Sequence, residues 1–544
     1  MMNGEEKPKP APSLAARVAI VLAIVLAGAA VRMVMVAGKA QLTHDECDAF
    51  VLALGHAPQY FHAQQGAYPA GQWVPARVWK DFLRVDQRFC FAAIRYGCAF
   101  YDNHPPLYFS LLHVWMLLMG VTPWSGVLLN TAIAMATTAA LYGFARFLTG
   151  SHWEAAFIAA AWALSPIVVS VAFEARPYEL KALIAVLFVW QSLRMIRNDP
   201  TAGWGNRTAI LVTALAGMLT HYYFAFVIAA TGFYALVRLA RRDNRRLALW
   251  IALSAAGCLL LFAVHPGALG AVGRQQQTVP PFQAENLPVR AYRVGTTLLG
   301  FAAYPKLLKA ALLAALIVGF VAGAVWVGRH REKALALYRA NAAALIPVYY
   351  FAFVGSLIIL LYMAFFSHAL AMGGKYLAAA WPFCAFIPAL LLRLVPRRKA
   401  LVAGVFLALL AAQSLWQAAN VWQRSPAADP APIFAGRARL LCDDPVRGFF
   451  PRVFIHAPDD MVVFAAPVSD LLKKPDTWLN DLGPSAVYVS DCTDEFGNSD
   501  ELTQMLGLVR PNYTATLRGG GIYGVGEVFM LDRSTPSVAR QGSH

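Results

Sequence analysis

The sequence predicts a polytopic α-helical membrane protein that ends in a smaller α/β or α+β domain. Of its 544 residues, 58% are hydrophobic and only 14% are charged, whereas a soluble domain carries about 25% charged residues. The mean hydropathy is +0.51, and apolar runs that suit a bilayer recur through most of the chain. The end of the chain instead contains short β-rich runs between polar turns, such as MVVFAA and VGEVFML.

The membrane part is predicted to occupy residues 15–418 and to cross the bilayer about eleven times. Residues 1–14 are polar and are expected to form a disordered cytoplasmic tail. The first apolar stretch lacks a cleavage site followed by a soluble domain, so we expect a retained anchor. Two short spans in 208–238 are broken at Thr220 and His221. The other spans are expected near 18–37, 124–147, 153–173, 178–195, 247–266, 306–328, 341–366, 377–394 and 400–418.

Basic residues indicate which loops face the cytoplasm. The net charge of +16 comes largely from arginines and lysines between the apolar runs, and this bias orients membrane proteins. The charge therefore does not indicate a nucleic-acid partner. The basic clusters share one side only if the apolar segment Pro105 to Gly120 does not cross. As a helix it would be only about 24 Å long, so we expect residues 104–120 to lie in the outer interface.

This orientation collects the remaining polar segments on the outer face. The tail is expected to fold there as an extracytoplasmic domain with a helix near 468–481. The outer segments are the first loop 38–103, the turns FEARPYEL (173–180) and THYYF (220–224), the loop 267–305, the sequence GGKY (373–376), and the tail 419–544.

The cysteines agree with an oxidising outer side, although their spacing does not fix any pairing. Cys442 with Cys492 and Cys90 with Cys98 are candidate disulfides. No CxxC or HExxH metal motif occurs in the sequence.

The densest acidic cluster begins the first outer loop, in the sequence QLTHDECDAF. Four ionisable residues lie within five positions: His44, Asp45, Glu46 and Asp48. Such a cluster can simply cap the end of a span. A functional interpretation gains support from polar residues in the other outer segments, since charged groups at membrane spans usually mark function. The polar residues of those segments are His104, Glu174, Arg176, Tyr178, His221, Tyr222, Lys375 and Tyr376.

The break after Thr220 gives His221 a particular position. A helix from Thr208 to Thr220 is only about 20 Å long, so His221 and Tyr222 are expected low in a groove open to lipid or water. A core histidine that bonds a neighbouring span is the alternative interpretation.

Carboxylates and cations beside lipid suit the transfer of a sugar from a lipid phosphate. A carboxylate removes the proton of an acceptor hydroxyl or amine, and arginine or lysine stabilises the departing phosphate. This reaction requires no phosphate-cradling glycine loop, and the sequence contains none.

At these motifs the sequence resembles the glycosyltransferase-C superfamily, in the branch of protein O-mannosyltransferases and lipid A aminoarabinose transferases. The resemblance covers roughly residues 15–395 and depends on an Asp-Glu pair, HPPLYF, EARPYEL and Lys-Tyr before a late span. It implies a glycosyltransferase-C fold, a polyprenyl-phosphate sugar donor, and an acceptor that is a lipid, a glycan such as lipopolysaccharide, or a protein. It also implies the bacterial inner membrane, with the active site on the periplasmic side.

The resemblance implies a role for each site candidate. Asp45 would be the general base and Glu46 would support the site, while Arg176, His221 and Lys375, with Tyr222, would lie near the donor phosphate. No cofactor is required. Thr43-His44 departs from the aromatic residue or proline that many relatives have before the acidic pair. A divalent cation is therefore an alternative, with possible ligands His44, Asp45, Asp48 and Glu174.

Two other classes of function compete with the transferase. A transporter or flippase for polyprenyl-linked or anionic lipids would use the same groove and cations without a base. Transporters often contain repeated broken helices, and the break in 208–238 has no second copy in the sequence. A membrane scaffold would leave the clustered acids unexplained.

Overall fold

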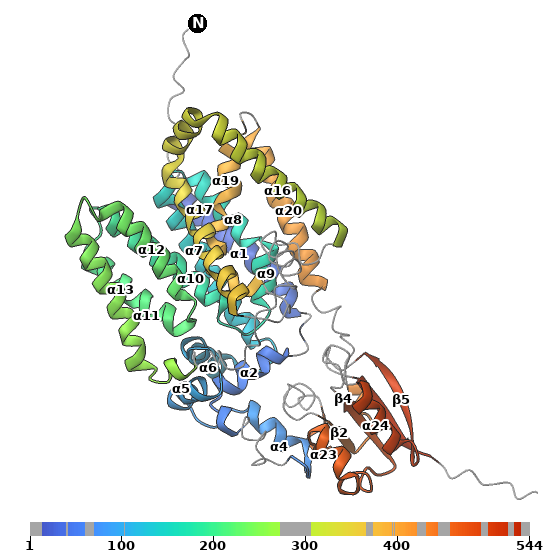
Figure 1. Ribbon diagram of the computed structural model, residues 1–544. Helices are drawn as coiled ribbons and strands as arrows, with labels where there is room; N and C mark the ends of the chain where they lie inside the picture. The colour runs from blue at the N-terminus through green and yellow to red at the C-terminus, as the bar shows by residue number, and fades with distance from the viewer. Residues whose placement is uncertain are drawn as a thin grey trace, which may run out of the picture.

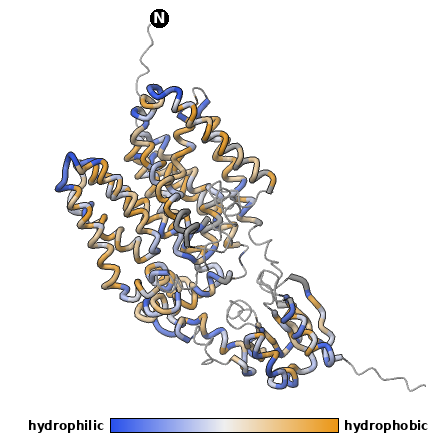
Figure 2. Tube along the Cα trace, viewed as in Figure 1, coloured by the Kyte–Doolittle hydropathy of each residue, from blue (hydrophilic) through white to orange (hydrophobic). Residues whose placement is uncertain are grey.

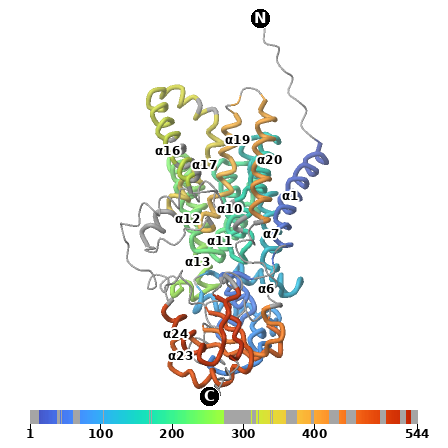
Figure 3. Tube along the Cα trace, turned by 90° about the vertical axis from the view of Figure 1, so that its right-hand side faces the viewer, coloured from blue at the N-terminus to red at the C-terminus, as the bar shows by residue number. Residues whose placement is uncertain are grey.

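The computed structural model describes residues 13–37, 39, 42–59, 70–102, 104–271, 306–365, 374–393, 395, 398–420, 431–443, 457–490, 499–520 and 527–534. These residues form a bundle of mainly hydrophobic helices and, at one end of it, a smaller body built on a six-stranded sheet (Figures 1 and 2). The first described helix, α1 (Leu14–Ala37), begins on the side of the bundle that faces away from the sheet (Figure 3).

The bundle contains long helices in the order of the apolar runs. Its helices are α1 (Leu14–Ala37), α6 (Leu107–Met119), α7 (Ser125–Thr149), α8 (His152–Ala163), α9 (Pro166–Ala172), α10 (Tyr178–Ile196), α11 (Trp204–Thr220), α12 (Phe224–Leu239), α13 (Asn244–Val264), α16 (Lys306–Arg329), α17 (Arg331–Phe365), α18 (Trp381–Cys384), α19 (Phe386–Arg393) and α20 (Lys399–Asn420).

Five helical segments of the described chain are long and apolar enough to cross a membrane, by length and composition. Shorter apolar helices accompany them, and together they make the chain a multi-pass helical membrane protein. The five segments are Leu14–Ala37, Ser125–Thr149, Asn244–Val264, Asn341–Ile358 and Lys399–Ala419. Eleven crossings remain a prediction.

Several spans begin or break where the hydropathy pattern does not indicate it. The expected span 153–173 is divided into α8 and α9 at Ser165, because Pro166 cannot continue the hydrogen bonding of a helix. The expected span 377–394 is likewise divided into a 3₁₀ turn, α18 and α19. In contrast, α17 starts ten residues before the expected position 341, at Arg331, because its first turns are helical although they contain charged residues such as Glu332 and Lys333.

Two local features agree with the prediction. The helix pair in 208–238 breaks after Thr220, where α11 ends and the backbone of His221 is extended. The segment after His104 forms the short helix α6, whose 13 residues span only about 20 Å. This length is below the roughly 30 Å hydrocarbon thickness of a bilayer.

The segment 38–103 is folded rather than a simple loop. Its described part contains α2 (His44–Ala53), β1 (Trp73–Pro75), α4 (Ala76–Lys80), the 3₁₀ turn η1 (Asp81–Leu83) and α5 (Phe91–Phe100). The described part of 267–305 ends at Ala271.

The C-terminal sheet has the strand order β1-β3-β2-β4-β6-β5. The strand β2 pairs in parallel with β3 and β4, whereas β5–β6, β4–β6 and β1–β3 are antiparallel. A helix was expected at 468–481, and α23 with the 3₁₀ turn η5 covers part of it. The remaining elements are α21 (Ala431–Phe434), β2 (Arg439–Cys442), β3 (Val462–Ala465), α23 (Val468–Lys473), η5 (Pro475–Thr477), β4 (Ser485–Ser490), α24 (Ser499–Val509), β5 (Tyr513–Gly520) and β6 (Glu527–Arg533).

The sheet is completed by a strand from the segment 38–103. Trp73 of β1 pairs with Phe464 of β3, and Lys80 forms an ion pair with Asp459 at 2.6 Å. Val51 of α2 and Trp79 of α4 are buried in the same hydrophobic core as the sheet residues. The sheet body therefore packs against the segment that carries the acidic cluster, and both lie at the same end of the bundle (Figure 3).

The candidate disulfide between Cys90 and Cys98 is wrong, because both are buried free thiols. Cys90 is the N-cap of α5, and Cys98 lies within that helix. Eight residues along a helix separate Cα atoms by about 12 Å, whereas a disulfide requires about 4.4–6.8 Å.

We expect a disulfide between Cys442 and Cys492, although Cys492 lies outside the described residues. Cys442 ends β2 beside Val489 of β4, and Cys492 follows the end of β4 by two residues in the sequence. Alkylation of the denatured, unreduced protein followed by peptide mass spectrometry should leave both thiols unmodified. Alkylation of both would contradict the pairing, and a reduced sample in which both react is the control.

Candidate active site

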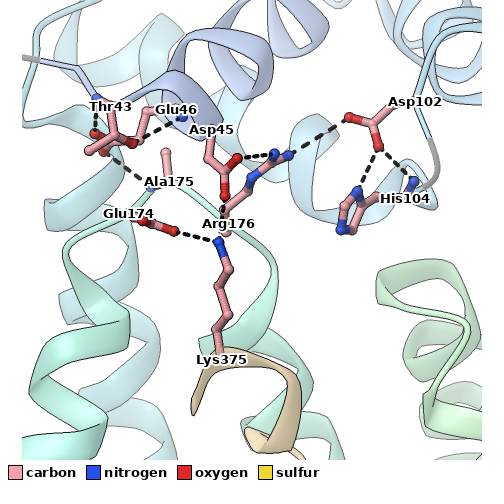
Figure 4. A network of polar contacts seen from close by, with 9 residues as sticks. All are labelled: Thr43, Asp45, Glu46, Asp102, His104, Glu174, Ala175, Arg176 and Lys375. Carbon is pink, nitrogen blue, oxygen red and sulfur yellow. Dashed lines mark hydrogen bonds and ion pairs between the residues drawn. The ribbon is translucent and has the colours of Figure 1, made fainter. Parts of the chain in front are cut away.

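The acidic cluster forms the first turn of α2. The Thr43 hydroxyl accepts a hydrogen bond from the backbone N–H of Glu46 at 3.4 Å, and the Glu46 carboxylate accepts one from the N–H of Thr43 at 2.9 Å. This reciprocal capping box starts the helix. Asp45 lies in the same turn, where the helix dipole favours negative charge. The sequence Thr-His-Asp-Glu thereby fixes two adjacent carboxylates in different surroundings (Figure 4).

Glu46 is fully buried and holds three chain segments together. It forms an ion pair with Lys39, which follows α1, and accepts a hydrogen bond from the N–H of Ala175 at 3.1 Å. Lys39 also donates to the carbonyl of Phe173 at 3.0 Å. In the described part of the chain no ion pair joins Glu46 to the cations around Asp45. Its contacts therefore suit the predicted supporting role and not direct chemistry.

The turn between α9 and α10 carries Glu174 and Arg176. Asn130 of α7 donates to the carbonyl of Glu174 at 2.5 Å and to that of Ala172 at 3.2 Å. A Cβ atom at Gly126 would lie 2.3 Å from the Cβ of Ala175. Glycine at this position therefore lets the turn pack directly against α7.

Asp45 lies between two cations that are far away in the sequence. One oxygen contacts Arg176 Nη2 at 3.1 Å, and the other contacts Lys375 Nζ at 2.6 Å. Lys375 Nζ also lies 3.3 Å from Glu174. Burial alone would raise the pKa of Asp45, but the charges of Arg176 and Lys375 outweigh it and hold this pKa well below its usual range. Asp45 is therefore ionised.

Arg176 continues the network to a histidine. Its Nη1 lies 3.7 Å from Asp102, and Asp102 contacts Nδ1 of His104 at 2.6 Å. The backbone N–H of His104 also donates to Asp102 at 2.8 Å. Burial opposes the ionisation of Asp102, yet His104 and Arg176 lower its pKa to about 2. Asp102 was not predicted from the sequence, and its position two residues before His104 was the available signal.

The Arg176 guanidinium has unused donors. The residue is only 7% exposed. Its Nε makes no hydrogen bond with any described residue, and its Nη1 has only the 3.7 Å ion pair with Asp102. Buried donors are normally satisfied. A planar guanidinium with free donors suits an anion that accepts charge-assisted hydrogen bonds, such as a phosphate.

His221 follows the predicted break between α11 and α12, but its burial agrees with the alternative of a core histidine and not with an open groove. Its ring meets that of His104 edge to face with centroids 5.4 Å apart. The residue is 7% exposed; Nδ1 accepts the N–H of Tyr223 at 3.2 Å, and Nε2 makes no hydrogen bond with a described residue. Tyr222 packs against a small apolar cluster that includes Leu219 and Leu261.

Tyr178 and Tyr376 connect the two cation-bearing turns. Their rings meet edge to face at 6.0 Å, and Lys375 Nζ lies 5.9 Å from the centre of the Tyr178 ring. Lys375 belongs to the 3₁₀ turn η3 (Gly374–Leu377). The buried Lys181 of α10 donates to the carbonyl of Tyr376 at 3.2 Å and so anchors this turn. Lys181 was not predicted from the sequence, although a lysine one turn into an apolar helix is a signal of function.

Asp45 and Glu174, the possible ligands of a divalent cation, both pair with a lysine. Within the described ranges no three His, Cys, Asp or Glu side chains come together as a metal site. Lys375 lies between the two carboxylates and contacts both. Asp48 is partly exposed on α2, and the side chain of His44 lies outside the described part.

Comparison with known proteins connects this geometry to an enzyme class. The family model described as dolichyl-phosphate-mannose-protein mannosyltransferase matches residues 103–266. This region contains His104, Glu174, Arg176 and His221 but neither Asp45 nor Lys375. A search of curated proteins finds no match.

Solved structures extend the similarity along the chain. ArnT from Cupriavidus metallidurans bound to undecaprenyl phosphate is 14% identical with a TM-score of 0.51, covering 95% of this chain and 98% of ArnT. The oligosaccharyltransferase AglB from Archaeoglobus fulgidus, in complex with an inhibitory peptide and a dolichol-phosphate, is 11% identical with a TM-score of 0.43. The match covers 96% of this chain and 75% of AglB. The family model and the fold shared with ArnT confirm the predicted resemblance to the glycosyltransferase-C superfamily and the predicted class, a glycosyltransferase.

Proposed function

We propose that this glycosyltransferase of the glycosyltransferase-C type moves a sugar from a polyprenyl-phosphate donor to an acceptor at the outer face of the bacterial inner membrane. The acceptor is a lipid, a glycan or a protein. The observation that carries the proposal is the ionised Asp45 between Arg176 and Lys375, beside unused guanidinium donors. The fold supports it further, because the matched ArnT structure contains undecaprenyl phosphate.

The donor phosphate and Asp45 compete for the same cations. When the phosphate binds the free donors of Arg176 and attracts Lys375, Asp45 loses part of the positive charge that keeps its pKa low. Its basicity then rises only while a donor is present. Asp102 still contacts Arg176, and Glu174 still contacts Lys375, so both cations keep their positions.

The chemical step is a single displacement. Asp45 takes the proton of the acceptor hydroxyl or amine while the acceptor atom bonds to the anomeric carbon. The bond between that carbon and the phosphate oxygen breaks, and its electrons leave with the polyprenyl phosphate. Arg176 and Lys375 stabilise the charge that develops on this oxygen. One displacement without a covalent carboxylate intermediate inverts the anomeric configuration.

Donor affinity should depend on Arg176. The change Arg176→Ala removes a charge-assisted contact with the phosphate, and such contacts contribute about 1.5–3 kcal/mol, or roughly a 10- to 100-fold change in Kd. The measurement is binding of a polyprenyl-phosphate sugar to the purified, folded variant. Arg84→Ala is the matched control, because Arg84 is exposed and pairs with Asp81. Unchanged donor affinity in Arg176→Ala would contradict the phosphate assignment.

We also propose eleven crossings, with α6 in the outer interface and residues 419–544 on the periplasmic side. A cysteine placed at position 480 should react with an impermeant thiol reagent added from the periplasm, whereas one at position 243 should react only after the inner membrane is permeabilised. Both positions lie in turns or at helix ends of the described chain. Labelling of position 243 but not of position 480 in intact cells would contradict this topology and indicate the opposite orientation.

A further inference from the structure

A polar pocket lies at the end of the bundle opposite Asp45. The helix α11 runs away from it and ends at His221, next to His104, while α12 runs back to Leu239. The starts of α11 and α13 are therefore about 25 Å from the His221 end, the length of a 17-residue helix. The pocket has a volume of about 290 Å³ and is lined by Met195, Asn198, Asp199, Ala202, Asn206, Arg207, Asp243, Arg245, Arg246 and Leu249.

The lining has uncompensated positive charge. Asp243 pairs with Arg246 at 3.0 Å, and Asp199 pairs with the adjacent Arg194 at 3.2 Å. Arg207 and Arg245 form no ion pair with any carboxylate in the described ranges. Two guanidinium groups are thus available to an anion in the pocket, and guanidinium is well suited to phosphate oxygens.

A buried acceptor in the same lining also lacks a partner. Asn206 is only 6% exposed, and its Nδ2 donates to Gln191, to the carbonyl at 2.9 Å and to Oε1 at 2.7 Å. These two bonds fix the orientation of the amide. Its Oδ1 accepts no hydrogen bond from a described residue, and a buried acceptor of this kind normally has a donor. The pocket therefore offers cations for a phosphate and an acceptor for a hydroxyl or ammonium group.

The surroundings indicate that this group belongs to a lipid. Trp204 is 79% exposed at the start of α11, and Arg207 lies over its ring at 4.9 Å; tryptophan and arginine side chains commonly lie at a membrane interface. Large apolar side chains on the neighbouring helix surfaces are also exposed, including Val212, Leu236 and Val237. The turn between α12 and α13 is hydrophilic and caps these surfaces (Figure 2).

We propose that this pocket binds the head group of an anionic phospholipid from the leaflet opposite the Asp45 site. Arg207 and Arg245 would contact the phosphate, and a hydroxyl-bearing head group such as that of phosphatidylglycerol would donate to Asn206. A pocket volume of about 290 Å³ accommodates one head group. Basic pockets between helices at a membrane surface commonly bind anionic lipids.

The test compares two double variants with the same change in charge. Arg207→Gln with Arg245→Gln alters the pocket, whereas Arg241→Gln with Arg242→Gln alters exposed residues of the adjacent turn that do not line it. Native mass spectrometry of the full chain, released from mixed phosphatidylglycerol and phosphatidylcholine nanodiscs, counts the retained lipid. We expect the wild type and the turn variant to retain one phosphatidylglycerol, and the pocket variant to retain it at least tenfold less often.

Equal retention by both variants would overturn the proposal, because attraction to surface charge in general would then account for binding. Displacement of the lipid by millimolar inorganic phosphate would overturn the lipid assignment in favour of a soluble phosphate. An unchanged melting temperature in detergent shows that the pocket variant is folded. If it is not, the single change Arg245→Gln at an exposed position serves as the test.

Discussion

Asp45→Asn should reduce turnover by roughly 10²- to 10⁴-fold, the usual contribution of a positioned general base. Asparagine keeps the shape of the side chain but cannot accept the acceptor's proton. The fold should persist, because Arg176 retains Asp102 and Lys375 retains Glu174. Donor binding should survive or tighten, since a negative charge that competes with the phosphate is removed.

The measurement is transfer of a labelled sugar in nanodiscs, together with donor affinity in the same preparation. Asp81→Asn is a matched control, because Asp81 belongs to the same segment 38–103, is half exposed and pairs only with Arg84 among the described ion pairs. A turnover close to that of the wild type in Asp45→Asn would mean that Asp45 is not the base. The transporter alternative predicts that this variant still moves lipid, so a vesicle translocation assay distinguishes the two functions.

Glu46→Gln should instead destabilise the protein by about 3–5 kcal/mol, the cost of removing one partner from a buried ion pair. Lys39 would then be left as a buried charge without its carboxylate. The loss would loosen the attachment of α1 and of the Glu174–Arg176 turn to α2. We expect a lower melting temperature in detergent and a lower yield of folded protein, with substantial turnover per folded molecule.

A double variant separates the loss of stability from an effect on catalysis. Lys39→Met together with Glu46→Gln removes both charges, and such replacements often restore stability. The double variant should therefore melt closer to the wild type than Glu46→Gln does. A Glu46→Gln protein that melts normally but shows no turnover would make Glu46, and not Asp45, the base.

Sequence and structure agree where the determining interactions are local. The broken pair α11–α12 follows from an apolar run that ends at Thr220, and the short α6 follows from the length of its apolar segment. The capping pattern of Thr43 and Glu46 is also local, so the position of Asp45 in a first helical turn depends on adjacent residues only.

The class of the protein was also determined by the sequence alone. Low charge and repeated apolar runs specify a helical membrane protein, because the bilayer imposes both requirements on any chain that crosses it. The motifs HPPLYF and EARPYEL indicated the enzyme class through their resemblance to the glycosyltransferase-C superfamily.

Only the tertiary structure decided which charges meet. Lys375 contacts Asp45 across 330 positions of the chain, Lys39 neutralises Glu46, and Asp102 joins Arg176 to His104. Likewise, Trp73 contributes its strand to a sheet whose other strands begin at Arg439. Hydropathy and capping act over a few residues, whereas ion pairs and strand pairing depend on how distant segments pack. For that reason the sequence predicted the two candidate carboxylates, but only the fold shows that Asp45 lies in the partly exposed site and Glu46 in the protein interior.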